Sequence, residues 1–205
     1  SSLPATLIAL FFVQFLWFFG LHGQIIVNSV MDPIWNTLML DNLEAYQHGK
    51  ELPHIITKPF METFTVGIGG SGMTLAVVLL MAFVLKKKQY RDVGRLALAP
   101  GIFNVNEPAI FGLPIVLNAI MFIPFLIAPV VATAIGWLAT YFGLVAPVSQ
   151  QVTWVVPPFL LSFLATGADW RAPIVTLVCM VVTFLIWAPF VISANKMDPA
   201  AGEQQ

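Results

Sequence analysis

The stretch of sequence that decides the fold is APGIFNVNEPAIFGLP, residues 99–114. Three prolines and two glycines interrupt this otherwise apolar segment, and an internal proline costs a continuous helix about 3 kcal/mol or more. Non-helical backbone at membrane depth is tolerated only where it is buried in protein or lines a watery cavity. The stretch therefore predicts a re-entrant hairpin or a discontinuous helix, the arrangement that forms substrate sites in secondary transporters.

The composition around this stretch is that of an integral membrane protein. Charged residues make up 9% of the 205 residues and hydrophobic residues 59%, whereas soluble domains carry about 25% charged residues. The formal net charge of −1 leaves no basic excess to neutralise phosphates, so nucleic-acid binding is excluded. The single Cys179 lies in an apolar run and the histidines lack metal-ligand spacing, so we expect neither a disulfide, nor a metal site, nor a cofactor.

Uncharged runs predict the membrane-spanning helices. Residues 1–31, 63–85 and 172–195 carry no Asp, Glu, Lys or Arg, and about 20 helical residues cross a hydrocarbon core of about 30 Å. We therefore predict an all-α integral membrane protein, a polytopic helical bundle with re-entrant hairpins or discontinuous helices, over residues 1–195. The polar residues 196–205 are expected to form a disordered tail.

The remaining charges indicate an orientation. Residues 86–95 (KKKQYRDVGR) are predicted to form a basic loop that faces the cytoplasm by the positive-inside rule. By parity, residues 41–58 lie nearer the outside or within a polar cavity. Residues 24–40 mix polar and apolar side chains, which suits a protein-buried or interfacial helix. The chain starts without a Met or a basic signal region, so we expect it to be part of a longer protein.

A single acidic residue interrupts the long charge-free stretch between Leu96 and Ala168, and it is Glu107. A carboxylate at membrane depth costs about 2.5–3.5 kcal/mol on insertion scales, so an intramembrane Glu is a functional residue by default. The neighbouring Asn104 and Asn106 are expected to donate amide hydrogens to it. The alternative is a buried Glu that pairs with another helix and fixes its packing.

Two further interrupted stretches accompany residues 99–114. Residues 145–166 (VAPVSQQVTWVVPPFLLSFLAT) place three prolines around a polar SQQ, so we expect a second hairpin or broken helix. The glycine run TVGIGGSGMT, residues 65–74, allows two interpretations. It is either a close helix contact through small residues or a phosphate or sugar cradle of backbone N–H groups.

The motif FFGLHG, residues 18–23, supplies a candidate ligand-binding histidine. A lone His on an apolar helix is usually a satisfied core residue, but the flanking glycines open space beside the His22 ring. Aromatic faces stack on sugar rings, while carboxylates, amides and imidazoles bind sugar hydroxyls. A carbohydrate site is therefore predicted from Trp17, His22, Asn104, Asn106, Glu107, Gln150 and Trp154.

These motifs together resemble a known family. GIFNVNEPAIFGLPIVLN, preceded by LWFFGLHG, is similar to the membrane-embedded enzyme IIC component of the bacterial phosphoenolpyruvate-dependent sugar phosphotransferase system. The likeness is strongest to the lactose/cellobiose/N,N′-diacetylchitobiose family, and it extends to the GGSG run, MFIPF and PFVISANK. It covers essentially the whole chain but only about the second half of the family's domain.

The resemblance implies a mechanism and a set of residue roles. Glu107 and His22 would hold the sugar near the hydroxyl that is phosphorylated and form the catalytic pair, while Trp17, Asn104, Asn106 and Trp154 would bind substrate. The chain would be the multi-pass permease of a bacterial cell membrane that presents the 6-hydroxyl of a β-linked disaccharide to the phosphocysteine of a IIB component.

Further partners follow from the same resemblance. IIB would itself be supplied by IIA and HPr, and the full-length protein would be a homodimer in the lipid bilayer. No residue of this chain would be phosphorylated. The basic segment 86–95 would be either a docking surface for IIB or a solvated anchor of its helix.

Two other functions remain open from the residues alone. One is a secondary transporter or channel that couples transport to ions through Glu107. The other is a membrane-embedded enzyme that uses Glu107 and His22 as an acid–base pair on a lipid-linked substrate. The chemical form of the product distinguishes the three functions, because only a phosphotransferase permease yields an intracellular sugar phosphate.

Overall fold

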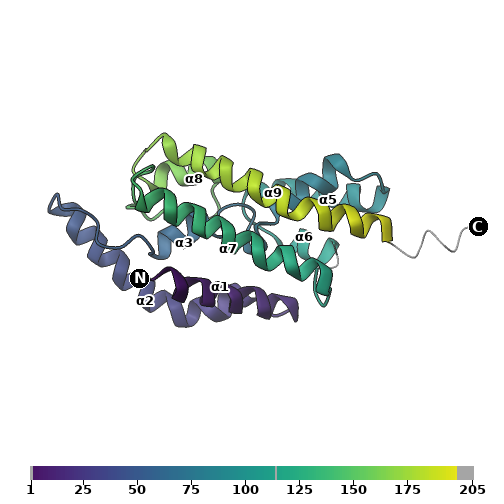
Figure 1. Ribbon diagram of the computed structural model, residues 1–205, viewed down its shortest axis with the longest axis horizontal. Helices are drawn as coiled ribbons and strands as arrows, with labels where there is room; N and C mark the ends of the chain where they lie inside the picture. Colours follow the sequence, from purple (N-terminus) through teal and green to yellow (C-terminus); the bar gives the residue numbers. More distant parts are fainter. Residues whose placement is uncertain (1, 114, 198–205) are drawn as a thin grey trace, which may run out of the picture.

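The computed structural model describes residues 2–113 and 115–197, and the regular secondary structure of these residues is helical, which confirms the all-α prediction. Figure 1 shows an elongated bundle with its longest helices along the long axis. In chain order the elements are α1 (Leu3–Phe18), α2 (Gly23–Gln47), α3 (Lys58–Phe64), η1 (Ser71–Met73), α4 (Leu75–Leu79), η2 (Leu80–Val84), α5 (Lys88–Ile102), α6 (Glu107–Gly112), α7 (Ala119–Tyr141), α8 (Pro158–Ala165) and α9 (Arg171–Met197).

The centre of the bundle is the pair α7 and α9, which pack side by side along the molecule (Figure 1). Within the described residues these are the two helices long and apolar enough to cross a membrane, over Ala119–Tyr141 and Arg171–Ser193. The second confirms the helix predicted over residues 172–195. No separate span was predicted for α7, which lies within the charge-poor stretch between Leu96 and Ala168 and contains Pro124 and Pro129.

The span predicted over residues 63–85 is wrong. The chain leaves α3 at Phe64, turns through the glycine run, and returns to helix only in the short elements η1, α4 and η2. Gly69, Gly70 and Gly72 have φ values of +86°, +78° and +76°, a left-handed conformation that glycine adopts without penalty. Most of the segment is buried against other helices. Its lack of charge therefore reflects burial in protein rather than contact with lipid.

Both proline-rich stretches are broken as predicted. Helix α5 ends at Ile102, and α6 begins only at Glu107 after a turn in which Asn104 has a φ of +65°. The chain from Val145 to Pro157 contains no helix before α8 begins at Pro158. Each break leaves backbone donors and acceptors that must be satisfied by other groups, which places polar contacts in the middle of the bundle.

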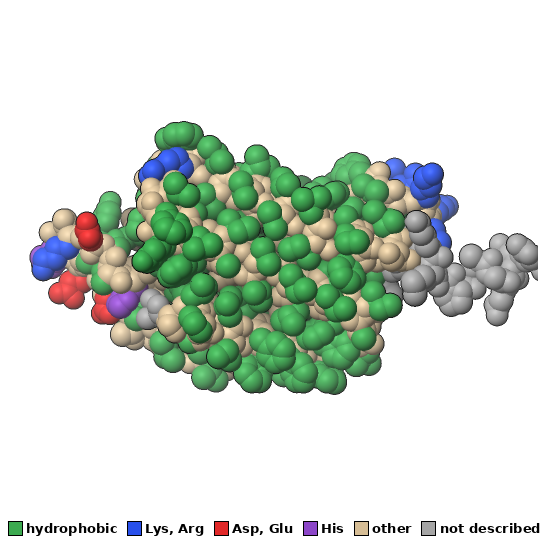
Figure 2. All heavy atoms as spheres, viewed as in Figure 1, with side chains coloured by type: hydrophobic (Ala, Val, Ile, Leu, Met, Phe, Trp, Pro, Cys, Tyr) green, Lys and Arg blue, Asp and Glu red, His purple; other side chains and the backbone are tan. Residues whose placement is uncertain are grey.

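The prediction that the basic segment 86–95 forms a loop is wrong. Helix α5 begins within it, at Lys88, and is amphipathic. Its charges nevertheless lie at one end of the molecule. Figure 2 shows apolar side chains over most of the visible face, with Lys and Arg near α5 at one end and a mixed cluster near the end of α2 at the other. An apolar band between two charged ends matches the profile of a membrane-embedded bundle.

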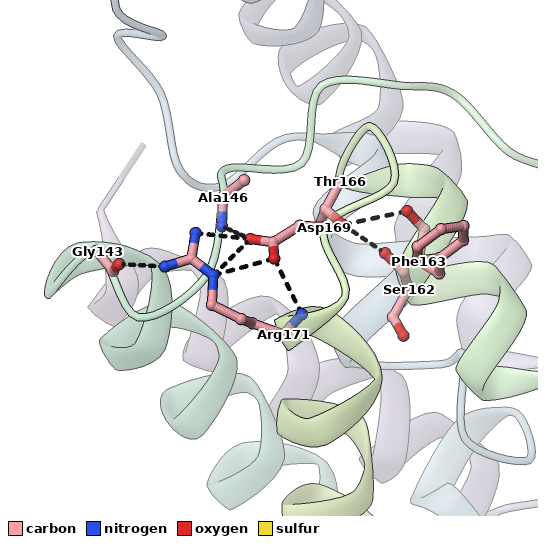
Figure 3. A network of polar contacts seen from close by, with 7 residues as sticks. All are labelled: Gly143, Ala146, Ser162, Phe163, Thr166, Asp169 and Arg171. Carbon is pink, nitrogen blue, oxygen red and sulfur yellow. Dashed lines mark hydrogen bonds and ion pairs between the residues drawn. The ribbon is translucent and has the colours of Figure 1, made fainter.

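A polar network joins the loop after α7 to the start of α9 (Figure 3). The Asp169 carboxylate accepts hydrogen bonds from the Ala146 N–H at 2.7 Å and from the Arg171 side chain and N–H at 2.9–3.1 Å. Arg171 also donates to the Gly143 carbonyl. The Arg171 side chain, aided by these backbone N–H groups, lowers the pKa of Asp169 to about 2 against the opposing effect of burial.

The tail predicted over residues 196–205 begins inside a helix. Lys196 and Met197 are the last residues of α9, and residues 198–205 lie outside the described part of the chain. The helix predicted over residues 24–40 is present as part of α2, which continues through Pro33. Helix α2 packs on α1 and α3, which brings its polar residues close to the broken segments.

Candidate functional site

A cavity of about 580 Å³ lies where the broken segments meet α2 and α3. This volume falls within the range of about 300–1,000 Å³ that is usual for small-molecule sites. Polar side chains from four parts of the chain line it, which is unusual in a bundle with so few charges. They are His22, Gln24, Asn28, Ser29, Asp32, Lys58, Glu62, Ser71, Asn104, Asn106 and Glu107, with Trp154 among the apolar wall residues.

Two of the predicted site residues, His22 and Glu107, face each other in this cavity. His22 Nε2 lies 3.6 Å from Glu107 Oε1, and the side chains are 40% and 43% exposed. His22 is the N-cap of α2, where its Nδ1 accepts a hydrogen bond from the Ile25 N–H at 3.3 Å. Because Nδ1 is an acceptor, the neutral ring carries its hydrogen on Nε2 and directs it toward the Glu107 side. The pair therefore offers one donor and one acceptor to a bound hydroxyl.

Trp17 lies behind His22 rather than on the cavity wall. The two ring centroids are 4.5 Å apart with an interplanar angle of 47°. The indole is only 3% exposed and belongs to the main apolar core with Val13 and Leu113. Trp17 thus fixes the position of the imidazole, and its ring does not line the space that a sugar would occupy.

Asn104 and Asn106 line the cavity, but their amides bond to the protein backbone. Asn104 uses both amide hydrogens on the carbonyls of Trp154 and Val156, at 2.6 Å and 3.0 Å. Asn106 donates to the Ser71 carbonyl at 3.0 Å. The expectation that Asn104 donates to Glu107 is therefore wrong, because the broken backbone nearby has carbonyls that it satisfies instead.

The second broken stretch contributes Trp154, a residue that lines the cavity and is 44% exposed. Gln150 is not among the lining residues. Its neighbour Gln151 donates instead from Nε2 to the Glu62 carboxylate at 2.6 Å. One residue along an extended segment reverses the side on which a side chain projects, so the sequence pattern could not choose between the two glutamines.

Sequence reasoning missed a polar row on α2 and α3. Gln24, Asn28 and Asp32 are spaced four residues apart, which puts them on one face of the helix. Lys58 and Glu62 have the same spacing on α3, and Lys58 forms an ion pair with Asp32. This four-residue spacing of polar side chains within apolar sequence was the available signal.

The row contains a carboxylate in an unusual environment. Burial raises the pKa of the Glu62 carboxyl, opposed by the Gln151 hydrogen bond and the charge of Lys58. Oδ1 of Asp32 is buried and has no hydrogen-bond partner among the described residues. A ligand with several hydroxyl groups could satisfy such oxygens, because each hydroxyl both donates and accepts.

Comparison with known proteins gives matches to EIIC components of the phosphotransferase system. The protein-family model described as "Phosphotransferase system, EIIC" matches residues 1–129. The chain is 52% identical to the PTS system oligo-beta-mannoside-specific EIIC component of Bacillus subtilis (strain 168), over 100% of this chain and 46% of that protein. It is 43% identical to the PTS system cellobiose-specific EIIC component of Lactococcus lactis subsp. lactis (strain IL1403), over 97% of this chain and 44% of that protein.

A solved structure gives the same result. The fold matches the crystal structure of the transporter ChbC, the IIC component from the N,N′-diacetylchitobiose-specific phosphotransferase system, with a TM-score of 0.94 and 40% identity. The match covers 100% of this chain and 47% of that one. The chain thus spans about half the length of the relatives it matches.

Proposed function

Because the chain belongs to the EIIC family of the phosphotransferase system, we propose that it is the sugar-binding part of a permease that takes up β-linked disaccharides. The names of its relatives specify oligo-β-mannoside, cellobiose and N,N′-diacetylchitobiose. The substrate class we assign is accordingly a disaccharide of the cellobiose, diacetylchitobiose or lactose type. The cavity bounded by α2, α3 and the two helix breaks is its binding site.

The observation that carries this proposal is the His22–Glu107 pair, half-exposed in the cavity with 3.6 Å between Nε2 and Oε1. A hydroxyl oxygen can lie about 2.8 Å from both atoms, which is a normal hydrogen-bond distance. It would accept from the His22 Nε2–H and donate to the Glu107 carboxylate. We assign this hydroxyl to carbon 6 of the sugar.

The chemistry then follows from a phosphoryl donor outside the chain. The 6-hydroxyl oxygen attacks the phosphorus of a IIB phosphocysteine, the cysteine thiolate leaves, and Glu107 takes the hydroxyl proton as general base. Cys179 cannot be the phosphocysteine because it is buried in α9. The sugar phosphate carries a charge that disfavours its return past Glu107, which helps to make uptake one-way.

The remainder of the disaccharide has a place along the polar row. Asp32, Lys58 and Glu62 line the same cavity as the pair, and they lie on α2 and α3 beyond the first turn of α2 that His22 caps. These charged groups can bind the hydroxyls or amides of a second ring by charge-assisted hydrogen bonds. Trp154, exposed on the same wall, offers an apolar surface to a ring face.

The topology we propose is a multi-pass permease of the bacterial cell membrane, homodimeric at full length, in which the broken segments are re-entrant. Its basic end near α5 would face the cytoplasm, where IIB, recharged by IIA and HPr, would dock. In support, the basic cluster and the mixed cluster of α2 lie at opposite ends of the apolar band (Figure 2). The positive-inside rule then selects the orientation.

Product analysis in vesicles tests this function. Membrane vesicles with the full-length permease are loaded with phosphoenolpyruvate and the cytoplasmic phosphotransferase proteins, and radiolabelled cellobiose is added outside. We expect cellobiose phosphate inside the vesicles and little uptake without phosphoenolpyruvate. Accumulation of unmodified sugar that depends on an ion gradient would identify a secondary transporter instead and would contradict the proposal.

A further inference from the structure

Three broken parts of the chain meet at the Asn104 side chain. Its Oδ1 accepts a hydrogen bond from the Gly69 N–H at 2.8 Å, which ties the glycine run to the break between α5 and α6. Its Nδ2 donates to the carbonyls of Trp154 and Val156 at 2.6 Å and 3.0 Å, which ties in the second broken stretch. The residue is 3% exposed. An asparagine is therefore buried at the point where the helix breaks converge.

The local backbone suits asparagine. Its φ of +65° lies in the left-handed region, which most side chains avoid and which asparagine and glycine tolerate. The opposing loop has no room for a side chain, because a Cβ on Gly70 would lie 2.7 Å from the Asn104 carbonyl oxygen and 2.9 Å from Asn106 Cβ. The two loops thus interlock, with the Asn104 amide as the bridge to Trp154.

The hydrogen-bonding capacity of this amide is largely used inside the protein. Both hydrogens and one oxygen lone pair are occupied, so no amide hydrogen remains for a sugar hydroxyl. Any effect of Asn104 on ligand binding must pass through the groups it holds. Among the residues whose backbone it holds, Trp154 is the one that lines the cavity.

Resting on the proposed function, we infer that Asn104 is a positioning residue, which places Trp154 against the sugar by holding the Trp154 and Val156 carbonyls. This differs from direct substrate binding, and it also differs from a general contribution to folding. A positioning role requires that the loss caused by changing Asn104 depends on Trp154. A general folding role requires no such dependence.

A double-mutant cycle in the full-length permease measures this dependence. Asn104→Asp keeps the oxygen that accepts from the Gly69 N–H and tolerates the left-handed backbone. Its second oxygen, however, replaces the amide group that donates to the carbonyls of Trp154 and Val156, so these two bonds are lost. We expect Asn104→Asp and Trp154→Ala each to weaken cellobiose binding about tenfold, the effect of a lost contact of ordinary strength. The double variant should bind cellobiose with about the same affinity as the single variant that binds it more weakly.

The matched control is Asn118→Asp. Asn118 caps α7 with its Oδ1 and lies outside the cavity, and aspartate caps a helix equally well. We expect this variant to bind cellobiose like the wild type. Equal weakening by Asn118→Asp would show that the added negative charge, rather than the position, causes the effect, and would overturn the inference.

Two further results would overturn it: full affinity in Asn104→Asp, or losses that multiply to about a hundredfold in the double variant. If Asn104→Asp elutes as an aggregate in size-exclusion chromatography, Asn104→Gly replaces it in the cycle, because glycine keeps the left-handed backbone and adds no charge. Failure of this cycle leaves the proposed function intact as long as vesicles still form sugar phosphate. Absence of sugar phosphate formation in wild-type vesicles would instead disprove the function itself.

Discussion

The imidazole of His22 lies with its centroid 4.5 Å from that of the Trp17 indole, so the histidine of the site rests on a ring from the buried core. Trp17 is 3% exposed, whereas Trp154 on the cavity wall is 44% exposed. The two tryptophans therefore have different roles. Trp17 supports a functional side chain from behind, and Trp154 lines the cavity where we place the sugar.

Replacing these two tryptophans should affect different properties: the first replacement lowers stability, and the second lowers affinity for the disaccharide. Trp17→Ala removes a buried aromatic and should lower stability by about 3–5 kcal/mol. Trp154→Ala should leave the unfolding temperature close to wild type and weaken disaccharide binding. Thermal unfolding and ligand titration of the two purified permeases compare them directly. A stable Trp17→Ala protein whose only defect is weak binding would show that Trp17 contacts the sugar.

The polar row should recognise the second sugar ring. Glu62→Gln removes a charged acceptor from the part of the cavity that includes Asp32 and Lys58. We expect cellobiose to bind about tenfold more weakly. The affinity of glucose, measured by competition, should be unchanged, because a single sugar ring occupies only the part of the cavity next to Glu107. Glu44→Gln, on the exposed part of α2 outside this cavity, is the matched control. An equal loss of affinity for cellobiose and glucose would show that Glu62 does not bind the second sugar ring.

The close approach of the two loops should make Gly70 far less replaceable than another glycine with the same backbone. Gly70 and Gly143 have φ values of +78° and +68°, but an added Cβ meets Asn104 and Asn106 only at Gly70 and finds open space at Gly143. Gly143→Ala should cost about 1–2 kcal/mol of backbone strain. Gly70→Ala carries the same strain plus a clash with backbone, so its unfolding temperature should be clearly lower. Equal unfolding temperatures would contradict the interlocking of the loops.

The Asp169 network should make one part of the stability depend on pH. The pKa of Asp169 is lowered from 3.8 to about 2, so its contribution is fully present above about pH 4 and is lost as pH falls toward 2. Asp169→Asn should unfold at a lower temperature than wild type at about pH 6, with the difference shrinking below about pH 4. A difference that stays constant down to about pH 2 would show that the charge of Asp169 is not what stabilises the turn.

Several elements of the fold follow from local sequence and others do not. The prolines and glycines of residues 99–114 predict a broken helix, because each removes or weakens local helical bonding. The uncharged residues 63–85 led to a wrong prediction of a membrane span, because an apolar run is compatible with both lipid contact and burial in protein. The glycines at 69, 70 and 72 were the contrary signal, since a continuous span has no need of left-handed residues.

The candidate site shows the same division. Glu107 stands out in the sequence because charge at membrane depth is expensive, and the spacing of Gln24, Asn28 and Asp32 could have indicated a polar helix face. The contact of His22 with Glu107 joins segments that are distant in sequence. Residue chemistry placed both side chains in one predicted carbohydrate site, but spacing along the chain could not establish that they face each other. The bonds of Asn104 could not be foreseen, because they depend on carbonyls freed by a break elsewhere in the chain.

The most direct test of the account is the effect of Glu107→Gln on phosphorylation in the full-length permease, with Glu44→Gln as the control. Glutamine keeps the shape of the side chain but cannot take a proton, so we predict that phosphoenolpyruvate-dependent formation of cellobiose phosphate falls by about a hundredfold or more. The control should form it at the wild-type rate. Phosphorylation by Glu107→Gln at a rate near wild type would contradict the central claim that Glu107 acts on the sugar hydroxyl.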